Sequence, residues 1–192
     1  MKVLYFMLIF FIIFPNSISY SSQSDVINVA VNGTNKQLID ILKSPKKSFI
    51  LRKKENLVYD ARDYALYFSL HCKRLDNAET LIKHGAKLKN YSWLECNQAN
   101  KSNILKEIIR EEKSQIEDEG GVDPFLNVIF NYDKGKVDLN ILDLLFRNDK
   151  WYCSYESTDL GGSYYDSLVE EIKNNKNSEA KKQLKIFNKY CK

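Results

Sequence analysis

A recurring apolar triplet constrains this chain more than any other feature of its sequence. The triplet places side chains at positions i, i+3 and i+4, as in Val26, Val29 and Ala30. This spacing puts the three side chains on one face of an α-helix. A second triplet begins 12 residues later, at Leu38, and the offset leaves room for two short antiparallel helices and a tight turn. This segment therefore predicts a helix pair.

Three further pairs of triplets follow along the chain. They begin at Leu66 and Ala78, at Trp93 and Leu105, and at Phe125 and Ile141. The first two pairs repeat the offset of 12, and the third has an offset of 16, with its extra residues in a turn around residues 132–135. Helices this short are unstable alone, so neighbouring pairs must stack to bury their apolar faces.

A fifth and weaker pair is predicted over residues 164–173 and 178–190, with Ser178 as the N-cap of its second helix. Its outer face carries Lys181, Lys182, Lys185 and Lys189, which suits the end of a stack. The predicted fold is all-α, a solenoid of about five antiparallel helix pairs with short or absent hairpins.

Residues 64–90 resemble an ankyrin repeat, in which a leucine-rich helix ends in His-Gly-Ala, here residues 84–86. Residues 123–126 are similar to the Thr-Pro-Leu-His opening of that family, with Asp123 as N-cap and Pro124 at the first helical position. Residues 30–33 resemble the turn between the two helices of a repeat. The resemblance spans residues 25–146 loosely, and the uneven spacing of the pairs departs from the family period of about 33 residues. A tetratricopeptide-like or Sel1-like solenoid is the alternative.

The first 19 residues resemble a secretion signal. Lys2 precedes an uninterrupted apolar run at residues 3–14, and Ser17 and Ser19 occupy the positions expected at a cleavage site. The run is shorter than the roughly 20 residues that a membrane-spanning helix needs. We therefore expect cleavage after Ser19 and a single mature domain, residues 20–192, without membrane insertion. An uncleaved N-terminal anchor is the alternative.

Four cysteines, Cys72, Cys96, Cys153 and Cys191, lie in the predicted mature chain. An even number of cysteines in an exported protein permits disulfides, and four cysteines allow three connectivities that sequence alone does not resolve. Proximity in sequence favours Cys72–Cys96 and Cys153–Cys191.

Motifs that carry chemistry are missing from the sequence. No nucleophile elbow, zinc-protease helix or phosphate-binding glycine loop occurs. His71 and Cys72 are adjacent, and neighbouring residues on a helix do not face each other. We expect no enzyme activity, no cofactor and no metal. A net charge of +4 is also too mild to indicate a nucleic-acid partner.

Two segments are candidate binding surfaces. Glu117, Asp118 and Glu119 form an acidic stretch, which is either an anionic binding loop or a solvated helix end. The second segment holds Trp151, Tyr152 and Tyr155. These aromatic residues are either interface anchors or a small core clamped by Cys153–Cys191.

Resemblance to the ankyrin family implies binding to another protein without chemistry. Read as an exported bacterial chain, the sequence suggests a periplasmic immunity protein that inhibits a co-encoded toxin, such as an effector of a type VI secretion system. This step rests on compartment, size and fold class rather than on any residue. A secreted ankyrin-like effector and an envelope structural or assembly factor are the alternatives.

Overall fold

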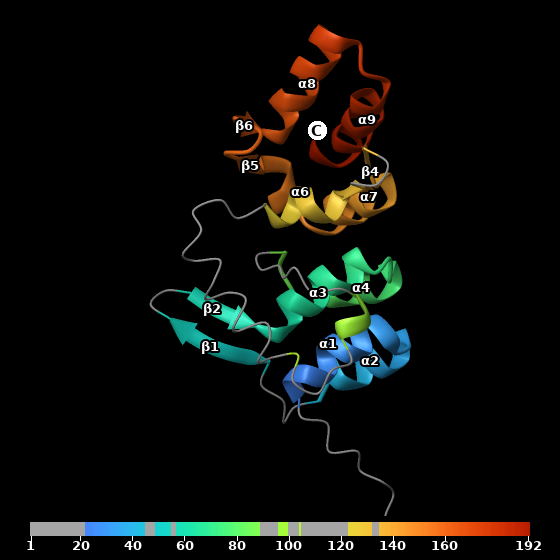
Figure 1. Ribbon diagram of the computed structural model, residues 1–192, viewed down its shortest axis with the longest axis vertical. Coiled ribbons are helices and arrows are strands. Elements are labelled where there is room, and N and C mark those ends of the chain that lie inside the picture. Colours follow the sequence, from blue (N-terminus) through green and yellow to red (C-terminus); the bar gives the residue numbers. More distant parts are fainter. Residues whose placement is uncertain are drawn as a thin grey trace, which may run out of the picture.

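The computed structural model describes residues 22–44, 49–54, 57–88, 96–99, 104, 123–131 and 135–192, and these residues are mostly helical (Figure 1). They form eight α-helices: α1 (Ser22–Asn32), α2 (Asn35–Leu42), α3 (Ala61–His71), α4 (Leu75–Lys83), α6 (Pro124–Ile129), α7 (Leu139–Asn148), α8 (Tyr164–Asn175) and α9 (Ser178–Cys191). The predominance of helix agrees with the predicted class.

Short strands form three two-stranded antiparallel hairpins: β1 (Ile50–Lys54) with β2 (Leu57–Asp60), β3 (Phe130–Asn131) with β4 (Lys136–Val137), and β5 (Glu156–Ser157) with β6 (Gly162–Ser163). The described residues also form two 3₁₀ helices, η1 (Cys96–Gln98) and η3 (Lys150–Ser154). The hairpins connect or interrupt helix pairs and do not join into a larger sheet.

Four of the five predicted helix pairs are present, as α1/α2, α3/α4, α6/α7 and α8/α9, and they follow one another from bottom to top in Figure 1. Their triplets face inward, as expected. Leu38, Leu66, Leu81, Phe125 and Ile141 are all completely buried. The predicted pair that begins at Trp93 and Leu105 lies almost wholly outside the described residues; two positions of its first triplet are described, and they belong to η1.

Successive pairs stack in register. Helix α1 packs on α3 and α3 on α6, while α2 packs on α4 and α4 on α7. Helix α3 is buried over almost its whole length because the other pairs surround it. In the last pair, α9 packs against both α7 and α8, and its four predicted outer lysines are exposed.

Helix ends follow the chemistry of their capping residues. The Asp123 carboxylate accepts hydrogen bonds from the backbone N–H groups of Phe125 and Leu126, with Pro124 at the first turn, as predicted. The predicted N-cap of α9 is wrong by one residue. Asn177, rather than Ser178, accepts from the first backbone N–H groups of that helix.

The turn after α4 matches the predicted His-Gly-Ala ending. His84 is the C-cap residue of α4, and Gly85 has a φ of +85°, a backbone conformation that favours glycine. The turn expected at residues 30–33 is shorter than predicted, because α1 continues to Asn32 and only Gly33 separates it from the capping residue Thr34.

Both favoured disulfides are present, and they tie different parts of the stack. Cys72 and Cys96 join the end of α3 to η1, with an S–S distance of 2.11 Å. Cys153 and Cys191 join η3 to the end of α9, with an S–S distance of 2.08 Å.

Within the residues that the structure describes, no helix is both long and apolar enough to cross a membrane. The predicted signal segment, residues 1–19, lies outside the described residues.

Candidate functional site

The predicted aromatic segment is divided between core and surface. Tyr152 and Tyr155 are 1% and 6% exposed, and their rings lie 5.5 and 4.5 Å from the ring of Phe125 on α6. Trp151 is 52% exposed and packs edge-on against both tyrosines. The two tyrosines thus form a small core beside Cys153, and only Trp151 offers a partner a large apolar surface.

Burial also controls the ionisation of Tyr152. It raises the pKa of Tyr152 well above its ordinary value, and the nearby Asp149 carboxylate raises it further. Tyr152 therefore keeps its proton at any physiological pH. The predicted acidic stretch, Glu117, Asp118 and Glu119, lies outside the described residues.

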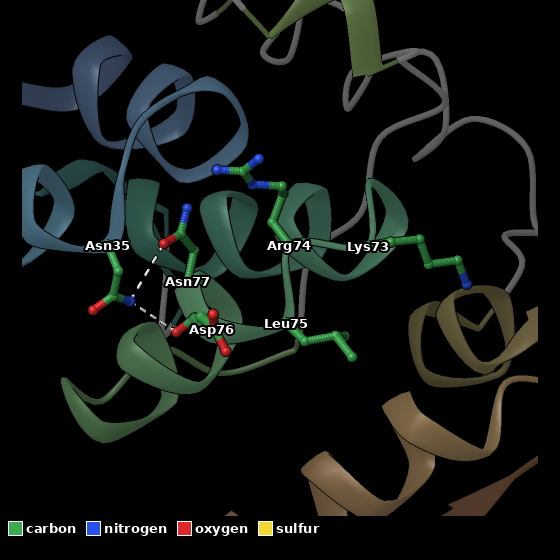
Figure 2. Close-up of a pocket in the computed structure, with 6 residues that line it drawn as sticks. All are labelled: Asn35, Lys73, Arg74, Leu75, Asp76 and Asn77. Atoms are coloured by element: carbon green, nitrogen blue, oxygen red, sulfur yellow. Dashed lines mark hydrogen bonds between the residues drawn. The ribbon is translucent and has the colours of Figure 1, made fainter.

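A polar pocket of about 390 Å³ lies at the turn between α3 and α4, lined by Asn35 and residues 73–77 (Figure 2). Asn35 Nδ2 donates to the backbone carbonyl of Asp76 at 2.9 Å and to Asn77 Oδ1 at 3.3 Å. Asn77 is buried, and its Nδ2 donates to the carbonyl of Ala30 at 2.9 Å. These amides are already used in joining the α3–α4 turn to the first helix pair.

The two cations of this pocket point in opposite directions (Figure 2). Arg74 extends toward the first pair and donates to the carbonyl of Gly33 at 2.7 Å. Lys73 extends toward the third described pair and forms an ion pair with Asp138, the N-cap of α7. We interpret this pocket as a structural junction between successive pairs.

A second pocket, of about 430 Å³, is mostly apolar. It lies among α6, α8, α9 and the hairpins β3–β4 and β5–β6, and is lined by Leu126, Ile129, Phe130, Val137, Asp159, Leu160, Tyr164, Ser167 and Gln183. Its volume falls within the range of about 300–1,000 Å³ that is common for ligand-binding pockets. Phe130 is 39% exposed, so part of the apolar lining faces solvent.

The hairpin β3–β4 supplies one wall of this apolar pocket. Phe130 and Val137 are opposite each other in the hairpin, and Gly135 has a φ of +58° beside its tip. This hairpin occupies the place where the sequence predicted extra residues in the turn between two triplets. The triplets that begin at Phe125 and Ile141 are 16 residues apart instead of 12, and this longer offset was the sequence signal for the hairpin wall. The pocket residues themselves were not predicted.

Apart from Asp159 in the β5–β6 turn, the polar side chains of the apolar pocket come from α8 and α9. Burial raises the pKa of Tyr164, so its hydroxyl stays protonated and donates to Gln183 Oε1 at 2.7 Å. Ser163 caps α8 by accepting from the Asp166 N–H, which fixes the first turn on which Tyr164 stands. The hydrogen bond between Tyr164 and Gln183 thus joins α8 to α9 at this pocket.

Reactive groups do not gather at either pocket. Cys72, the neighbour of His71, is bound in a disulfide and so is no thiol nucleophile. His84 lies in the turn after α4, with Nδ1 2.9 Å from the carbonyl of Thr80. Across the described part of the chain, no group of His, Cys, Asp and Glu side chains is arranged to hold a metal ion.

Comparisons with protein-family models, with curated proteins and with solved structures find no match to this chain.

Proposed function

We propose that this protein is a non-catalytic module that binds another protein through the apolar pocket among α6, α8 and the two hairpins. The observation that carries the proposal is the pocket itself, an open apolar cavity of about 430 Å³ whose rim includes the partly exposed Phe130. Exposed apolar surface with a polar surround is typical of interaction sites. The exposed Trp151 is a second candidate contact of the same partner.

The proposed architecture is an ankyrin-like solenoid. It is supported by the order of stacking, in which the first helices of three pairs pack on each other and the second helices do the same. The hairpin between α2 and α3, and the glycine turn after α4, also match the resemblance. The hairpin β3–β4 is a departure, because it interrupts a helix pair instead of joining two.

The proposed compartment is the bacterial periplasm. Support comes from the signal-like segment at residues 1–19 and from the disulfides Cys72–Cys96 and Cys153–Cys191, which are compatible with an oxidising environment. The proposed partner is a co-encoded toxin that this protein inhibits. Secretion toward a host, or a role in envelope assembly, would replace this proposal if no toxin gene adjoins the gene of this protein.

Co-purification with the product of the neighbouring toxin gene tests the proposal. We expect a stable complex that buries about 1,600 Å² in total, the usual size of a specific interface. Phe130→Asp should abolish the complex, because a charge would enter the apolar rim. Ile50→Asp is the matched control, since Ile50 is 40% exposed on a different hairpin, and it should bind normally.

Three results would contradict the proposal. Equal binding by wild type and Phe130→Asp would place the contact elsewhere, and loss of binding by Trp151→Ala alone would move it to the aromatic segment. If cells that lack this gene survive the neighbouring toxin unharmed, the inhibitor role is wrong.

A further inference from the structure

One buried side chain in the apolar pocket has hydrogen-bonding capacity that the protein does not use. Gln183 is 7% exposed and lines the pocket. Within the described part of the chain, its side chain makes one hydrogen bond, which Oε1 accepts from the Tyr164 hydroxyl at 2.7 Å. Because that bond fixes the orientation of the carboxamide, the Nε2 group remains as a donor. This amide donor lies at the surface of the pocket, where a bound carbonyl oxygen would accept a hydrogen bond from it.

A second unused polar group lies at the rim of the same pocket. Asp159 is exposed in the turn between β5 and β6, and its backbone N–H donates to Ser157 Oγ at 3.2 Å. The carboxylate has no ion pair within the described chain. Three other aspartates, in contrast, each pair with a lysine: Asp138, Asp143 and Asp149.

Apolar side chains line the same pocket as these two polar groups. Leu126 and Ile129 come from α6, Val137 from β4 and Leu160 from the β5–β6 turn. Lys136 precedes Val137 on β4, and successive strand residues point to opposite faces, so its charge lies on the other side of the hairpin. The pocket therefore combines an apolar wall, one amide donor and one negative charge.

We propose that this pocket binds a short extended segment of the partner protein in which a bulky apolar residue is flanked by lysine or arginine. The apolar side chain enters between α6 and the hairpins, a backbone carbonyl accepts from Gln183 Nε2, and the flanking cation faces Asp159. This inference rests on the proposed protein-binding function and adds the chemistry of the bound segment. An anionic ligand such as a fatty acid would instead meet the Asp159 carboxylate with like charge.

Titration of the ¹⁵N-labelled protein with the blocked peptide Gly-Lys-Phe-Lys-Gly tests this directly. The side-chain NH₂ resonances of Gln183 should shift, together with backbone resonances of the pocket walls. Two control peptides separate the contribution of the apolar residue from that of the positive charges. Gly-Glu-Phe-Glu-Gly keeps the apolar residue but reverses the charges, and Gly-Lys-Ser-Lys-Gly keeps the positive charges without the apolar residue. The acidic peptide should bind about threefold more weakly at low salt, as expected for one exposed charge pair. The serine peptide should not shift Gln183 at all.

Two variants complete the test. Asp159→Asn should remove the preference for lysine over glutamate while binding of the phenylalanine remains. Gln183→Met keeps the length of the side chain and removes both the proposed donor and the acceptor of the Tyr164 hydroxyl. It should weaken the lysine peptide about fivefold through the lost hydrogen bond to the peptide, and its melting temperature is measured to show that the pocket stays folded. Unchanged Gln183 resonances with every peptide, or equal shifts with the lysine and glutamate peptides, would overturn the inference.

These results are separable from failure of the proposed function. If the neighbouring toxin binds and Phe130→Asp abolishes that complex, while Asp159→Asn and Gln183→Met bind the toxin as wild type does, the function stands and the inferred chemistry is wrong. If no toxin binds, the proposed function fails, and the peptide titration still decides what the pocket recognises.

Discussion

The two interfaces on either side of the α3/α4 pair are built from different chemistry. The first, with α1/α2, is joined by hydrogen bonds to uncharged acceptors, since Asn77 and Ser69 both donate to the carbonyl of Ala30, Asn35 donates to Thr80 Oγ1 and Arg74 donates to the carbonyl of Gly33. The second, with α6/α7, carries three ion pairs: Lys73–Asp138, Arg147–Glu79 and Lys87–Asp149. Among the described residues, no ion pair spans the first interface.

Because of this difference, the stability of the second interface should depend on ionic strength more than the stability of the first. Buried amide hydrogen bonds depend little on salt, whereas partly exposed ion pairs are screened as ionic strength rises. The half of the molecule that bears the apolar pocket is thus attached through the interface that responds to solution conditions. Both interfaces also contain apolar contacts, which supply most of the free energy of folding.

The largest effect is expected from breaking both interfaces at once. Leu81 is completely buried in α4, which packs on α2 and on α7. Leu81→Asp would leave an unpaired charge in the core at a cost of about 3–5 kcal/mol, a large part of the free energy of unfolding of a small domain. We expect loss of the helical circular dichroism at physiological temperature. Lys83→Ala, on the exposed side of the same helix, should remain folded.

A smaller effect, confined to the first interface, is expected from Asn77→Ala. This change removes three hydrogen bonds and leaves the buried carbonyl of Ala30 without its amide donor, at a cost of about 2 kcal/mol. Urea denaturation would measure the loss, which should be the same at low and high salt. A loss that shrinks in high salt would contradict the contrast between the hydrogen bonds of this interface and the ion pairs of the second.

At the second interface, Lys87→Met should lower the free energy of unfolding by no more than about 1 kcal/mol, because Lys87 is largely exposed. In about 1 M NaCl, where charges are screened within about 3 Å, the difference from wild type should vanish. Comparison with Asn77→Ala under the same conditions sharpens the contrast, since only the lysine variant should depend on salt.

The smallest effect concerns pH. Burial alone would raise the pKa of Asp138, but hydrogen bonds from Lys73 and from the backbone N–H groups of Ile141 and Asn140 lower it below its ordinary value. The same balance between burial and a lysine hydrogen bond lowers the pKa of Asp149. A carboxylate whose pKa is lower in the folded state stabilises above its unfolded pKa, and this stability is lost as the pH falls.

The melting temperature should therefore fall by a few degrees between about pH 5 and pH 2 through these two groups. The double variant Asp138→Asn, Asp149→Asn keeps good capping residues and should show a smaller fall. An equal fall in the double variant would assign the pH dependence to other carboxylates.

Much of the fold could be predicted because it depends on local spacing. The triplets located three of the four described helix pairs, the weaker pattern at residues 164–190 located the fourth, and nearness in sequence favoured the two disulfides that form, Cys72–Cys96 and Cys153–Cys191. The turn at His84 and Gly85 was also predictable, since its signal is a glycine in a special backbone conformation. In each case the pattern and the structure it specifies lie close together in the sequence.

The pocket could not be predicted because it joins residues that are far apart in the sequence. Nothing near Gln183 indicates that Tyr164 would hold its carboxamide, or that Phe130 would lie across from them. Likewise, the sequence could not decide whether Tyr152 and Tyr155 face solvent. That depends on Phe125, which reaches them only after the helices have stacked.

The disulfide between Cys153 and Cys191 has a consequence for how the stack opens. Repeat stacks fray from their ends, because a terminal pair has only one neighbour. The bond closes residues 153–191, which include α8 and α9, into a covalent loop. The two ends of this loop, in η3 and α9, both contact α7. The helices α8 and α9, red in Figure 1, therefore cannot separate from the stack one at a time. Stepwise unfolding should start at the α1/α2 end.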